Sequence, residues 1–399
     1  MAVVGAGAAG LVAAAFAASR GADVLLVERT PDGGRKILIS GGGRCNILPS
    51  VLAPERFVTD SPAHVMRGML KSWPLHAQRA FFENDLNIPL ALEKDSGKLF
   101  PQSNRARDVR DGLVTLARTR GVRLQFDTSV TVIAPGPTGF TISTSSGPIV
   151  AARVVLATGG LSVPAIGSDG TGLAAAAALG HRMIDTYPAL TPLLGPDSGH
   201  AALSGVSLTA RLRGKAGSRT IETHGGFLFT HRGYSGPSVL DISHLMARKS
   251  DAAATIRAQW SALDRAAWHR EFEAPSALIS TLVARHLPSR LAERLMIESG
   301  VPADRRTSNL RRTERVALVG CLTSYVLPIS GDEGYKKAEV TGGGVALDEV
   351  DPRTLESRRC PGLYLCGELL DVFGPIGGHN FAWAWATGRA AGLAAGSEQ

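Results

Sequence analysis

The sequence predicts an α/β fold, in which a doubly wound parallel sheet is interrupted by an inserted domain. Three observations support this prediction. Residues 1–28 read as strand, glycine turn, helix and strand; the chain changes character near Tyr187; and a sheet-like pattern returns near Lys337. Because strand–helix–strand units build parallel sheets, the doubly wound domain is expected to begin at the first residue.

The composition is that of a globular protein with more than one core. The chain has 399 residues, of which 44% are hydrophobic and 20% are charged. Single hydrophobic cores stop growing at about 250–300 residues, so two or three structural units are expected. The 46 glycines are scattered and the charges are interspersed, which excludes a collagen-like repeat and bulk disorder.

The formal net charge of +8 would favour acidic partners, from phosphorylated cofactors to nucleic acid or an anionic membrane surface. However, no long run of like charge occurs, and aromatic residues make up only 6% of the chain. This pattern is typical of an arginine-rich surface. The sequence therefore favours a small-molecule substrate over nucleic acid, in a monomer or small homo-oligomer.

The cysteines indicate a reducing compartment. Cys360 and Cys366 are separated by five residues, and Cys45 and Cys321 lie far from them, so no CxxC or zinc-ribbon spacing occurs. We therefore expect no disulfide framework, no metal site and a cytoplasmic protein. The uncharged stretch 2–18 lacks a basic leader and is interrupted by glycines, so neither a signal peptide nor a membrane anchor is expected.

Regular elements are expected throughout the first half of the chain. After the opening unit, residues 107–120 have helical periodicity, and residues 122–126 read as the strand that follows. The next stretch alternates strand-like segments with glycine and proline turns. It predicts a small antiparallel meander that returns to a buried strand at 154–157.

The second half begins with prolines and the strand-like stretches SLTARLRG and GGFLFTH, which indicate an inserted domain. Residues 263–315 are helical in pattern, with two apolar runs separated by Pro288, and they are rich in arginine. Near Lys337 the pattern returns to sheet and ends in a helix rich in small residues.

Gly5, Gly7 and Gly10 have the GxGxxG spacing of a dinucleotide-binding turn. The first glycine permits the tight turn, the second lets the backbone approach a pyrophosphate, and the third lets the helix pack close to the strand. The helix amino terminus supplies free N–H groups. Glu28 ends the next strand and is placed to accept hydrogen bonds from ribose hydroxyls, which favours a cofactor without a 2′-phosphate.

Three further glycine clusters follow predicted strands. ISGGGRCN at 39–46 comes shortly after the second strand, where a simple nicotinamide-binding domain would usually run into another helix. A second cluster lies at 157–160, and the third begins at Gly367 and continues to Gly377 and Gly378. Repeated glycine turns at strand ends indicate one long ligand that is contacted along its length. No second GxGxxG follows a strand, so NADH or NADPH would dock transiently.

These motifs together resemble one family. GAGAAG with Glu28, SGGGRCN, LATGGLSVPAIGSDGTG, GGFLFTHRGYSGPSVLDIS, VTGGGVAL and LYLCGELLDVFGPIGGHNFAWAWATG, in this order, are similar to the bacterial BaiN-like flavoproteins, which are NAD(P)/FAD-dependent, aminoacetone-oxidase-like oxidoreductases. The resemblance spans nearly the whole chain. It implies a Rossmann-like, two-dinucleotide-type FAD-binding domain made of both chain ends, with an inserted antiparallel β domain and a helical cap.

The resemblance also implies a division of the chain and a set of cofactor-binding residues. The FAD-binding domain would comprise 1–187 and 336–399, the β-rich domain 188–262 with a return at 316–335, and the helical cap 263–315. The implied FAD-binding residues are Gly5, Gly7, Ala8, Ala9, Gly10, Glu28, Arg29, Arg35, Lys36, Ser40, Gly41, Gly42, Gly43, Asn46, Val130, Ala157, Thr158, Gly159, Gly160, Gly367, Glu368, Gly377, Gly378, His379, Asn380 and Phe381.

By the same resemblance, the first glycine turn and Glu28 would hold the pyrophosphate and adenosine ribose, and Val130 would contact adenine. Arg35, Lys36 and the backbone of residues 40–43 would line the pyrophosphate and flavin, and Gly367 and Glu368 would lie beside the ribityl chain. Residues 378–381 would present a helix amino terminus to the flavin N1–O2 edge. His379 stands where the family commonly has tyrosine.

Two further features have competing interpretations. Cys45 has no second cysteine nearby, so a packing role is favoured over a redox role. His231 and Tyr234, in THRGYSGP, could bind a substrate carboxylate or carbonyl, with either one as proton donor. The same stretch could equally be a capped turn in which Ser235 is the N-cap and Pro237 lies in the first helical turn. We assign no catalytic residue.

The sequence and the resemblance together predict a FAD-dependent oxidoreductase that acts on a small organic substrate, with NADH or NADPH as a donor. Two alternatives stay open. An RNA-modifying flavoprotein would use the arginines at 305–315 to hold phosphates. A non-catalytic flavin-binding sensor would keep the cofactor site without turnover.

Overall fold

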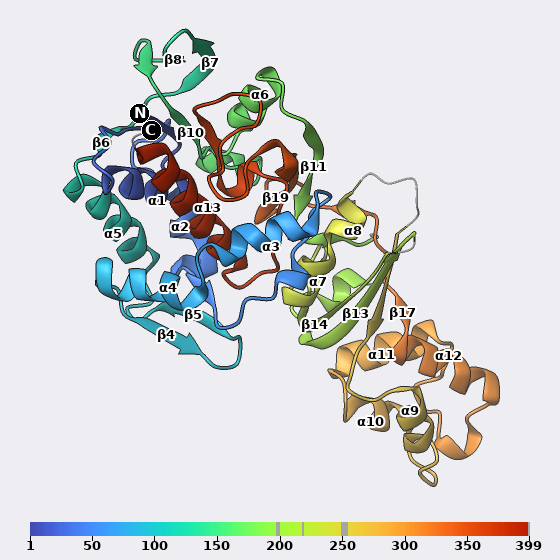
Figure 1. Ribbon diagram of the computed structural model, residues 1–399. Helices are drawn as coiled ribbons and strands as arrows, with labels where there is room; N and C mark the ends of the chain where they lie inside the picture. Colours follow the sequence, from blue (N-terminus) through green and yellow to red (C-terminus); the bar gives the residue numbers. More distant parts are fainter. Residues whose placement is uncertain (197–199, 218, 249–253, 398–399) are drawn as a thin grey trace. The chain divides into compact units, whose positions relative to one another are not determined.

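The computed structural model describes residues 1–196, 200–217, 219–248 and 254–397. The chain divides into two compact units, which are described separately (Figure 1). Unit 1 comprises Met1–Tyr187 and Glu339–Gln399, and unit 2 comprises Pro188–Ala338. The sequence predicts boundaries after residues 187 and 335, and the two units divide after Tyr187 and Ala338. Parts of the predicted segments, at 197–199, 218, 249–253 and 398–399, lie outside the described residues.

Unit 1 is built on a parallel sheet, as predicted. Its strands lie in the order β20-β10-β1-β2-β6, and every described neighbour pair is parallel. The strands are β1 (Ala2–Val4), β2 (Leu25–Val27), β6 (Arg123–Gln125), β10 (Val154–Leu156) and β20 (Leu363–Leu365). Strands β1, β10 and β20 are buried apolar triplets, as expected where helices cover both faces of a parallel sheet. Because β20 comes from the second segment, both segments of unit 1 contribute to this sheet.

Two helices rich in small residues, α1 (Ala8–Ala18) and α13 (His379–Gly396), pack side by side in unit 1 (Figure 1). Three glycines of α13 make this close approach possible. A Cβ added to Gly388, Gly392 or Gly396 would lie 2.4, 2.2 or 2.6 Å from the carbonyl oxygens of Ala9, Ala13 and Ala17. No side chain larger than hydrogen fits at these positions, so the two backbones are in direct contact.

The remaining elements of unit 1 surround this sheet. The meander consists of β7 (Val130–Gly136), β8 (Gly139–Thr144) and β9 (Ile149–Ala151), which pair antiparallel as predicted. The predicted helix at 107–120 is α5 (Ala106–Thr119). The other helices are α2 (Arg35–Ile39), a short 3-10 helix (Ser40–Gly43), α3 (Ala63–Lys71), α4 (Leu75–Ala80) and α6 (Thr171–Ala178). The other strands are β3 (Leu48–Pro49), β4 (Leu90–Glu93), β5 (Lys98–Pro101), β11 (Met183–Ala189) and β19 (Val340–Val345).

Unit 2 contains a β-sheet with strands of different lengths, in the order β17-β16-β13-β14-β15-β12-β18. Its described strand pairs are all antiparallel. The strands are β12 (Leu193–Leu194), β13 (Ser207–Ala216), β14 (Arg219–Phe229), β15 (Gly233–Ser235), β16 (Thr255–Gln259), β17 (Tyr325–Val326) and β18 (Gly331–Asp332). The long pair β13 and β14 corresponds to the stretches SLTARLRG and GGFLFTH, which the sequence predicts as strands.

The described helices of unit 2 are α7 (Pro237–Ile242), α8 (His244–Ala247), α9 (Arg265–Glu271), α10 (Ile279–Ala284), α11 (Ser289–Glu298) and α12 (Arg312–Thr323). Four of them, α9 to α12, lie in or overlap the predicted helical stretch 263–315, whereas α7 and α8 precede it, in the segment predicted to be β-rich. Pro288 is the N-cap of α11, so it separates the two apolar runs as expected. Helix α12 continues to Thr323, and the boundary drawn after residue 315 therefore falls inside a helix.

One local expectation is wrong. Ser235 is the last residue of β15, and the N-cap of α7 is Gly236, with Pro237 in the first turn as predicted. Gly236 has a φ of +95°, and a Cβ there would lie 2.6 Å from the carbonyl oxygen of Gly226. The tight strand-to-helix turn therefore requires glycine at the cap, and a serine side chain could not act from one residue earlier.

Candidate cofactor site

The first glycine turn joins β1 to α1 and leaves one open position. A Cβ on Gly5 would lie 2.6 Å from the Ala157 carbonyl oxygen, and one on Gly10 would lie 1.8 Å from the Gly5 carbonyl oxygen. A Cβ on Gly7 would meet no protein atom within 4 Å. Gly7 is also the N-cap of α1, and no side chain caps this helix. The turn thus presents free N–H groups at a position that another molecule can approach.

Glu28 braces this turn from the end of β2. Its Oε2 accepts a hydrogen bond from the Ala6 N–H at 2.7 Å, and its Oε1 accepts from the Thr30 N–H at 2.8 Å. The Glu28 carbonyl oxygen accepts a hydrogen bond from the Thr128 N–H at 2.9 Å. This bond holds the segment just before Val130, where the meander begins, next to Glu28. The carboxylate is half-buried.

The octapeptide ISGGGRCN forms the end of α2 and the 3-10 helix. Gly41, Gly42 and Gly43 have φ values of +55°, +68° and +83°, and a Cβ on Gly42 would meet nothing within 4 Å. Three left-handed residues in a row are accessible only to glycine and leave the backbone open to a ligand. Arg44 holds the following residues in place, because its guanidinium pairs with Glu93 at 3.0 Å and lies 4.1 Å from the Phe100 ring centroid.

Cys45 lies inside the protein and does not reach this surface. Its side chain is fully buried, and burial raises the pKa of its thiol to about 12. A thiolate is therefore absent near neutral pH, which agrees with the packing role favoured by the sequence. The described cysteines are all free thiols, and Cys360 and Cys366 are also buried.

The second and third glycine clusters meet at one carboxylate. Glu368, in the turn after β20, pairs through Oε2 with the Lys36 Nζ at 2.7 Å. Its Oε1 accepts hydrogen bonds from the Ser162 hydroxyl at 2.7 Å and from the Thr341 N–H at 2.9 Å. Ser162 and Thr341 were not singled out from the sequence, although both lie within the motif stretches LATGGLSVP and VTGGGVAL. The geometry therefore adds two residues to the candidate site.

The turn at 157–160 carries a buried polar atom without a protein partner. The Thr158 hydroxyl oxygen is buried and makes no hydrogen bond within the described residues. Gly159 next to it has a φ of +73°, and a Cβ on Gly160 would lie 2.3 Å from the Thr341 hydroxyl. An unsatisfied buried hydroxyl costs about 1–3 kcal/mol, so a ligand or solvent partner is expected at this turn.

The amino terminus of α13 is shaped by Gly378, its N-cap, which has a φ of +95° and lies close to the Leu48 backbone. His379 follows and is only 6% exposed; its Nδ1 lies 3.3 Å from the Ile376 carbonyl oxygen, while its Nε2 has no hydrogen bond among the described residues. Burial lowers the pKa of this histidine to about 4. Asn380 holds the preceding loop through the Gly374 N–H at 2.8 Å, and Phe381 stacks on Trp385.

Some expected residues are engaged elsewhere. Arg29 pairs with Asp169, just before α6, and Arg35 pairs with Asp32 at 2.8 Å. The structure thus brings together the turns at 5–10, 157–160 and 367–368 with Lys36. It ties Arg29 and Arg35 to the carboxylates of Asp169 and Asp32.

The THRGYSGP stretch lies in unit 2, and the position of Tyr234 in it does not favour a role as proton donor to a substrate. Tyr234 is fully buried, and its hydroxyl lies 2.7 Å from the His200 Nδ1. Burial raises the pKa of Tyr234 well above its usual range. Tyr234 is therefore a member of the unit 2 core, whereas His231 is exposed.

No helix among the described residues is long and apolar enough to cross a membrane. Likewise, no group of three or more His, Cys, Asp or Glu side chains within the described ranges is arranged to hold a metal ion.

Comparisons with known proteins agree with this architecture. The profile of the HI0933-like protein Rossmann domain matches residues 1–394. The ribosomal RNA dihydrouridine synthase of Escherichia coli strain K12 is 34% identical over 389 residues, covering 96% of this chain and 95% of the relative. The 3-dehydro-bile acid delta(4,6)-reductase of Clostridium scindens is 32% identical over 404 residues, covering 98% of each.

Among solved structures, the 3-ketosteroid delta1-dehydrogenase from Sterolibacterium denitrificans is similar, with a TM-score of 0.54 and 14% sequence identity. The similarity covers 99% of this chain and 98% of that chain. At this level of identity the similarity is one of fold.

Proposed function

The chain belongs to the HI0933-like family of Rossmann flavoproteins, and from this premise we propose that it is a FAD-dependent reductase of a carbon–carbon double bond conjugated to a carbonyl group. One observation carries the proposal. Two relatives above 30% identity, matched over nearly their whole length, have names that describe the saturation of such a bond, in a uracil base and in a keto-bile acid. Their substrates differ, so the bond change is the feature they share.

The candidate site supports FAD as the cofactor. Gly7 is open at a helix amino terminus, the run 41–43 exposes its backbone, and the Thr158 hydroxyl needs a partner. In this proposal the turn at 5–10 holds the pyrophosphate, Glu28 the adenosine ribose, and the turn at Glu368 the ribityl chain. All of these residues lie in unit 1, and several open turns within one unit are what an extended dinucleotide such as FAD would need.

Bound FAD, once reduced by a hydride donor, would supply a hydride to one carbon of the double bond, and a proton would be added to the other carbon. The protein's own contribution is electrostatic. The amino terminus of α13 places partial positive charge beside His379, and the buried His379 stays neutral near neutral pH because its pKa is about 4. NADH or NADPH is proposed as the hydride source and would dock transiently.

An anaerobic titration tests the proposal. Purified protein, reconstituted with FAD, should show oxidised-flavin absorbance that NADH or NADPH bleaches. Addition of a conjugated enone, or of uridine in RNA, should restore the absorbance. Absence of flavin bands after reconstitution would contradict the cofactor, and failure of every conjugated alkene to reoxidise the flavin would contradict the reaction. A protein that binds FAD but shows neither step would be a flavin-binding sensor.

Ribosomal RNA is the second candidate substrate, because the Escherichia coli relative is named for it. The arginines that begin α12, Arg311 and Arg312, lie in exposed positions and could contact phosphates. Loss of dihydrouridine from the ribosomal RNA of a deletion strain, measured by mass spectrometry, would favour this candidate. RNA affinity that does not fall as salt rises would contradict it. A cytoplasmic location and a monomer or small homo-oligomer remain part of the proposal, and size-exclusion chromatography tests the latter.

A further inference from the structure

Lys98 reaches the amino terminus of α13 from a distant part of the sequence of unit 1. It is the first residue of β5, and a Cβ added to Gly377 would lie 3.2 Å from its Cε and 3.5 Å from its Cγ. The lysine chain therefore lies along the backbone of Gly377, the residue before the N-cap Gly378. Because Nζ is one bond beyond Cε, the ammonium lies within about 5 Å of the same point.

The ammonium of Lys98 is half-buried and makes no ion pair or hydrogen bond with any described residue. Glu93 lies directly opposite on β4, but its two oxygens are engaged elsewhere. Oε1 pairs with the Arg44 guanidinium at 3.0 Å, and Oε2 accepts a hydrogen bond from the Ser96 hydroxyl. A partly buried cation without a counter-charge of its own favours an anionic group beside it.

The amino terminus of α13 is a second source of positive charge at this place. No side chain caps the helix at Gly378, and its first turn contains no acidic residue. The free N–H groups of the first turn and the positive end of the helix dipole therefore meet no carboxylate from this turn. The charge of Lys98 and that of the helix end have the same sign, so both favour the same kind of ligand.

Strand β5 also connects this place to the glycine run at 41–43. Lys98 and Phe100 are two residues apart on β5, so their side chains point to the same face of the sheet formed by β3, β5 and β4. A Cβ added to Gly41 would lie 3.1 Å from the Phe100 ring. One face of the strand thus contacts both the glycine run and the loop before α13, the two segments that the family resemblance assigns to the flavin.

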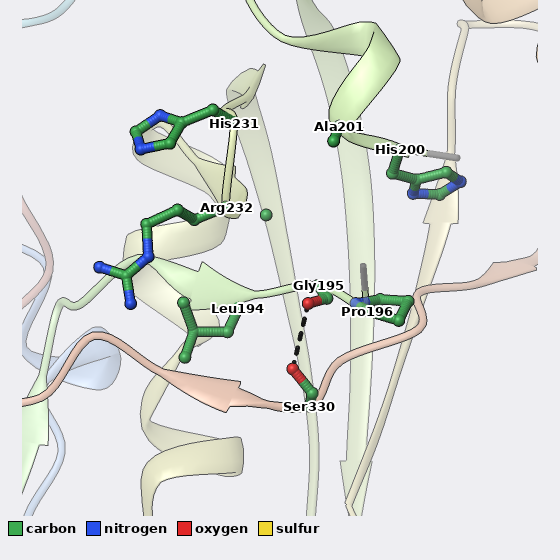
Figure 2. Close-up of a pocket in the computed structure, with 9 residues that line it drawn as sticks. Leu194, Gly195, Pro196, His200, Ala201, His231, Arg232 and Ser330 are labelled. Atoms are coloured by element: carbon green, nitrogen blue, oxygen red, sulfur yellow. Dashed lines mark hydrogen bonds between the residues drawn. The ribbon is translucent and has the colours of Figure 1, made fainter. Parts of the chain in front are cut away.

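The pocket of unit 2 shows a different arrangement. It has a volume of about 300 Å³ and is lined in part by Gly195 and Ser330 (Figure 2). The side chains of His231 and Arg232 begin at its edge but extend away from those two residues (Figure 2). A ligand inside this pocket would meet neither side chain. Lys98, by contrast, lies against the helix end beside which its charge would act.

We infer that Lys98 is a cofactor-binding residue whose charge stabilises FAD in its reduced state. The inference deepens the proposed function and rests on it in one respect, that FAD is the bound group. Transfer of a hydride adds two electrons and one proton to the neutral flavin ring, so the reduced ring carries one negative charge, at its N1–O2 edge. The family resemblance places this edge at residues 378–381. Lys98 should therefore favour reduced FAD over oxidised FAD, which is neutral at the same edge.

A redox titration of the FAD-loaded full chain tests Lys98 without turnover. The midpoint potential of bound FAD is measured against a reference dye, and the dissociation constant of oxidised FAD is measured by reconstitution. Lys98→Met should bind oxidised FAD within about twofold of the unmodified protein but reduced FAD about tenfold more weakly. For a two-electron couple, a tenfold difference lowers the midpoint potential by about 30 mV.

Lys94→Met is the matched control. Lys94 is exposed in the turn between β4 and β5, so its substitution removes the same charge from the same hairpin and should leave the potential unchanged. Lys98→Arg keeps the charge and should keep the potential. The inference is overturned if Lys98→Met and Lys94→Met have the same potential, or if Lys98→Met loses affinity for oxidised and reduced FAD equally.

The same variants separate this inference from the proposed function. A lowered potential in Lys98→Met, together with no reoxidation of the flavin by any conjugated alkene, supports the role of Lys98 and contradicts the proposed reaction. Reoxidation by an enone, together with equal potentials in Lys98→Met and Lys94→Met, contradicts the role of Lys98 alone. An unmodified protein that binds no FAD after reconstitution contradicts both.

Discussion

Lys36 and Glu368 lie 332 residues apart in the sequence and form an ion pair of 2.7 Å within unit 1. Their side chains are 27% and 17% exposed, so the pair is only partly screened by solvent. The pair joins α2, just before the glycine run, to the turn after β20. Ser162 completes the junction, because its hydroxyl contacts both charged groups.

Lys36→Met should weaken FAD binding. The substitution leaves the Glu368 carboxylate without its counter-charge, and hydrogen bonds between charged groups are worth about 1.5–3 kcal/mol, so FAD affinity should fall tenfold or more. The dissociation constant is measured by reconstituting protein stripped of flavin. Arg182→Gln is the control, because Arg182 pairs with Asp348 in the same unit while half-exposed. Equal FAD affinity in the two variants would contradict the role given to Lys36.

Gly392→Ala should destabilise unit 1. The added methyl would lie 2.2 Å from the Ala13 carbonyl oxygen and would force α13 away from α1, at a cost of about 1–3 kcal/mol. Gly68→Ala, at an exposed position of helix α3, adds a methyl that meets no atom within 4 Å and should instead stabilise by about 0.5–1 kcal/mol. Urea unfolding measures both. A Gly392→Ala protein as stable as Gly68→Ala would mean that the helices can separate without cost.

His379 should make stability depend on pH. Burial lowers its pKa to about 4 in the folded protein, from 6.5, so between these values the unfolded chain binds a proton that the folded chain does not. Stability is therefore lost as pH falls from 6.5 to 4, by at most about 3 kcal/mol. His379→Gln should flatten this part of the stability profile, measured by urea unfolding at a series of pH values. An unchanged slope would assign the effect to other groups.

Cys45 should be inert to thiol reagents. Its pKa of about 12 and complete burial keep it protonated and inaccessible at pH 8, as they do Cys366. Cys321 is only partly buried and should be modified first. Mass spectrometry after brief iodoacetamide treatment of the native protein identifies the modified site. Cys45 labelled ahead of Cys321 would reopen a redox role for it.

Much of the fold follows from local patterns. The turn at Gly5–Gly10 is predictable because each glycine has a separate steric reason. The insertion is predictable because prolines at 188, 192 and 196 precede new strand-like stretches. The α1–α13 contact is less accessible from sequence. The sequence shows that α13 is rich in small residues, but it does not show which helix the glycines of α13 contact. That contact depends on the strand order, in which β20 lies at the edge of the sheet.

The site was harder to predict than the fold. Glu368 could be singled out by its position after a strand, but its partners Ser162 and Thr341 come from turns whose proximity arises only on folding. Tyr234 shows the opposite case: a tyrosine in a polar motif suggests chemistry, yet it lies fully buried in the core of unit 2. The sequence predicts Ser235 as the N-cap of α7, whereas the structure has Gly236 there. Glycine is needed because the backbone of β14 lies close to this position, and local sequence rules do not include such a distant contact.

The packing of α13 on α1 also sets an order of events during protein synthesis. Helix α1 emerges from the ribosome first, but the helix that covers it follows after all of the strands and helices between them. Unit 2 is translated in the interval and, with its own core, can fold while α1 still waits for its partner. Until α13 has been synthesised, the alanine-rich face of α1 is exposed apolar surface. Chaperones bind such surfaces on nascent chains.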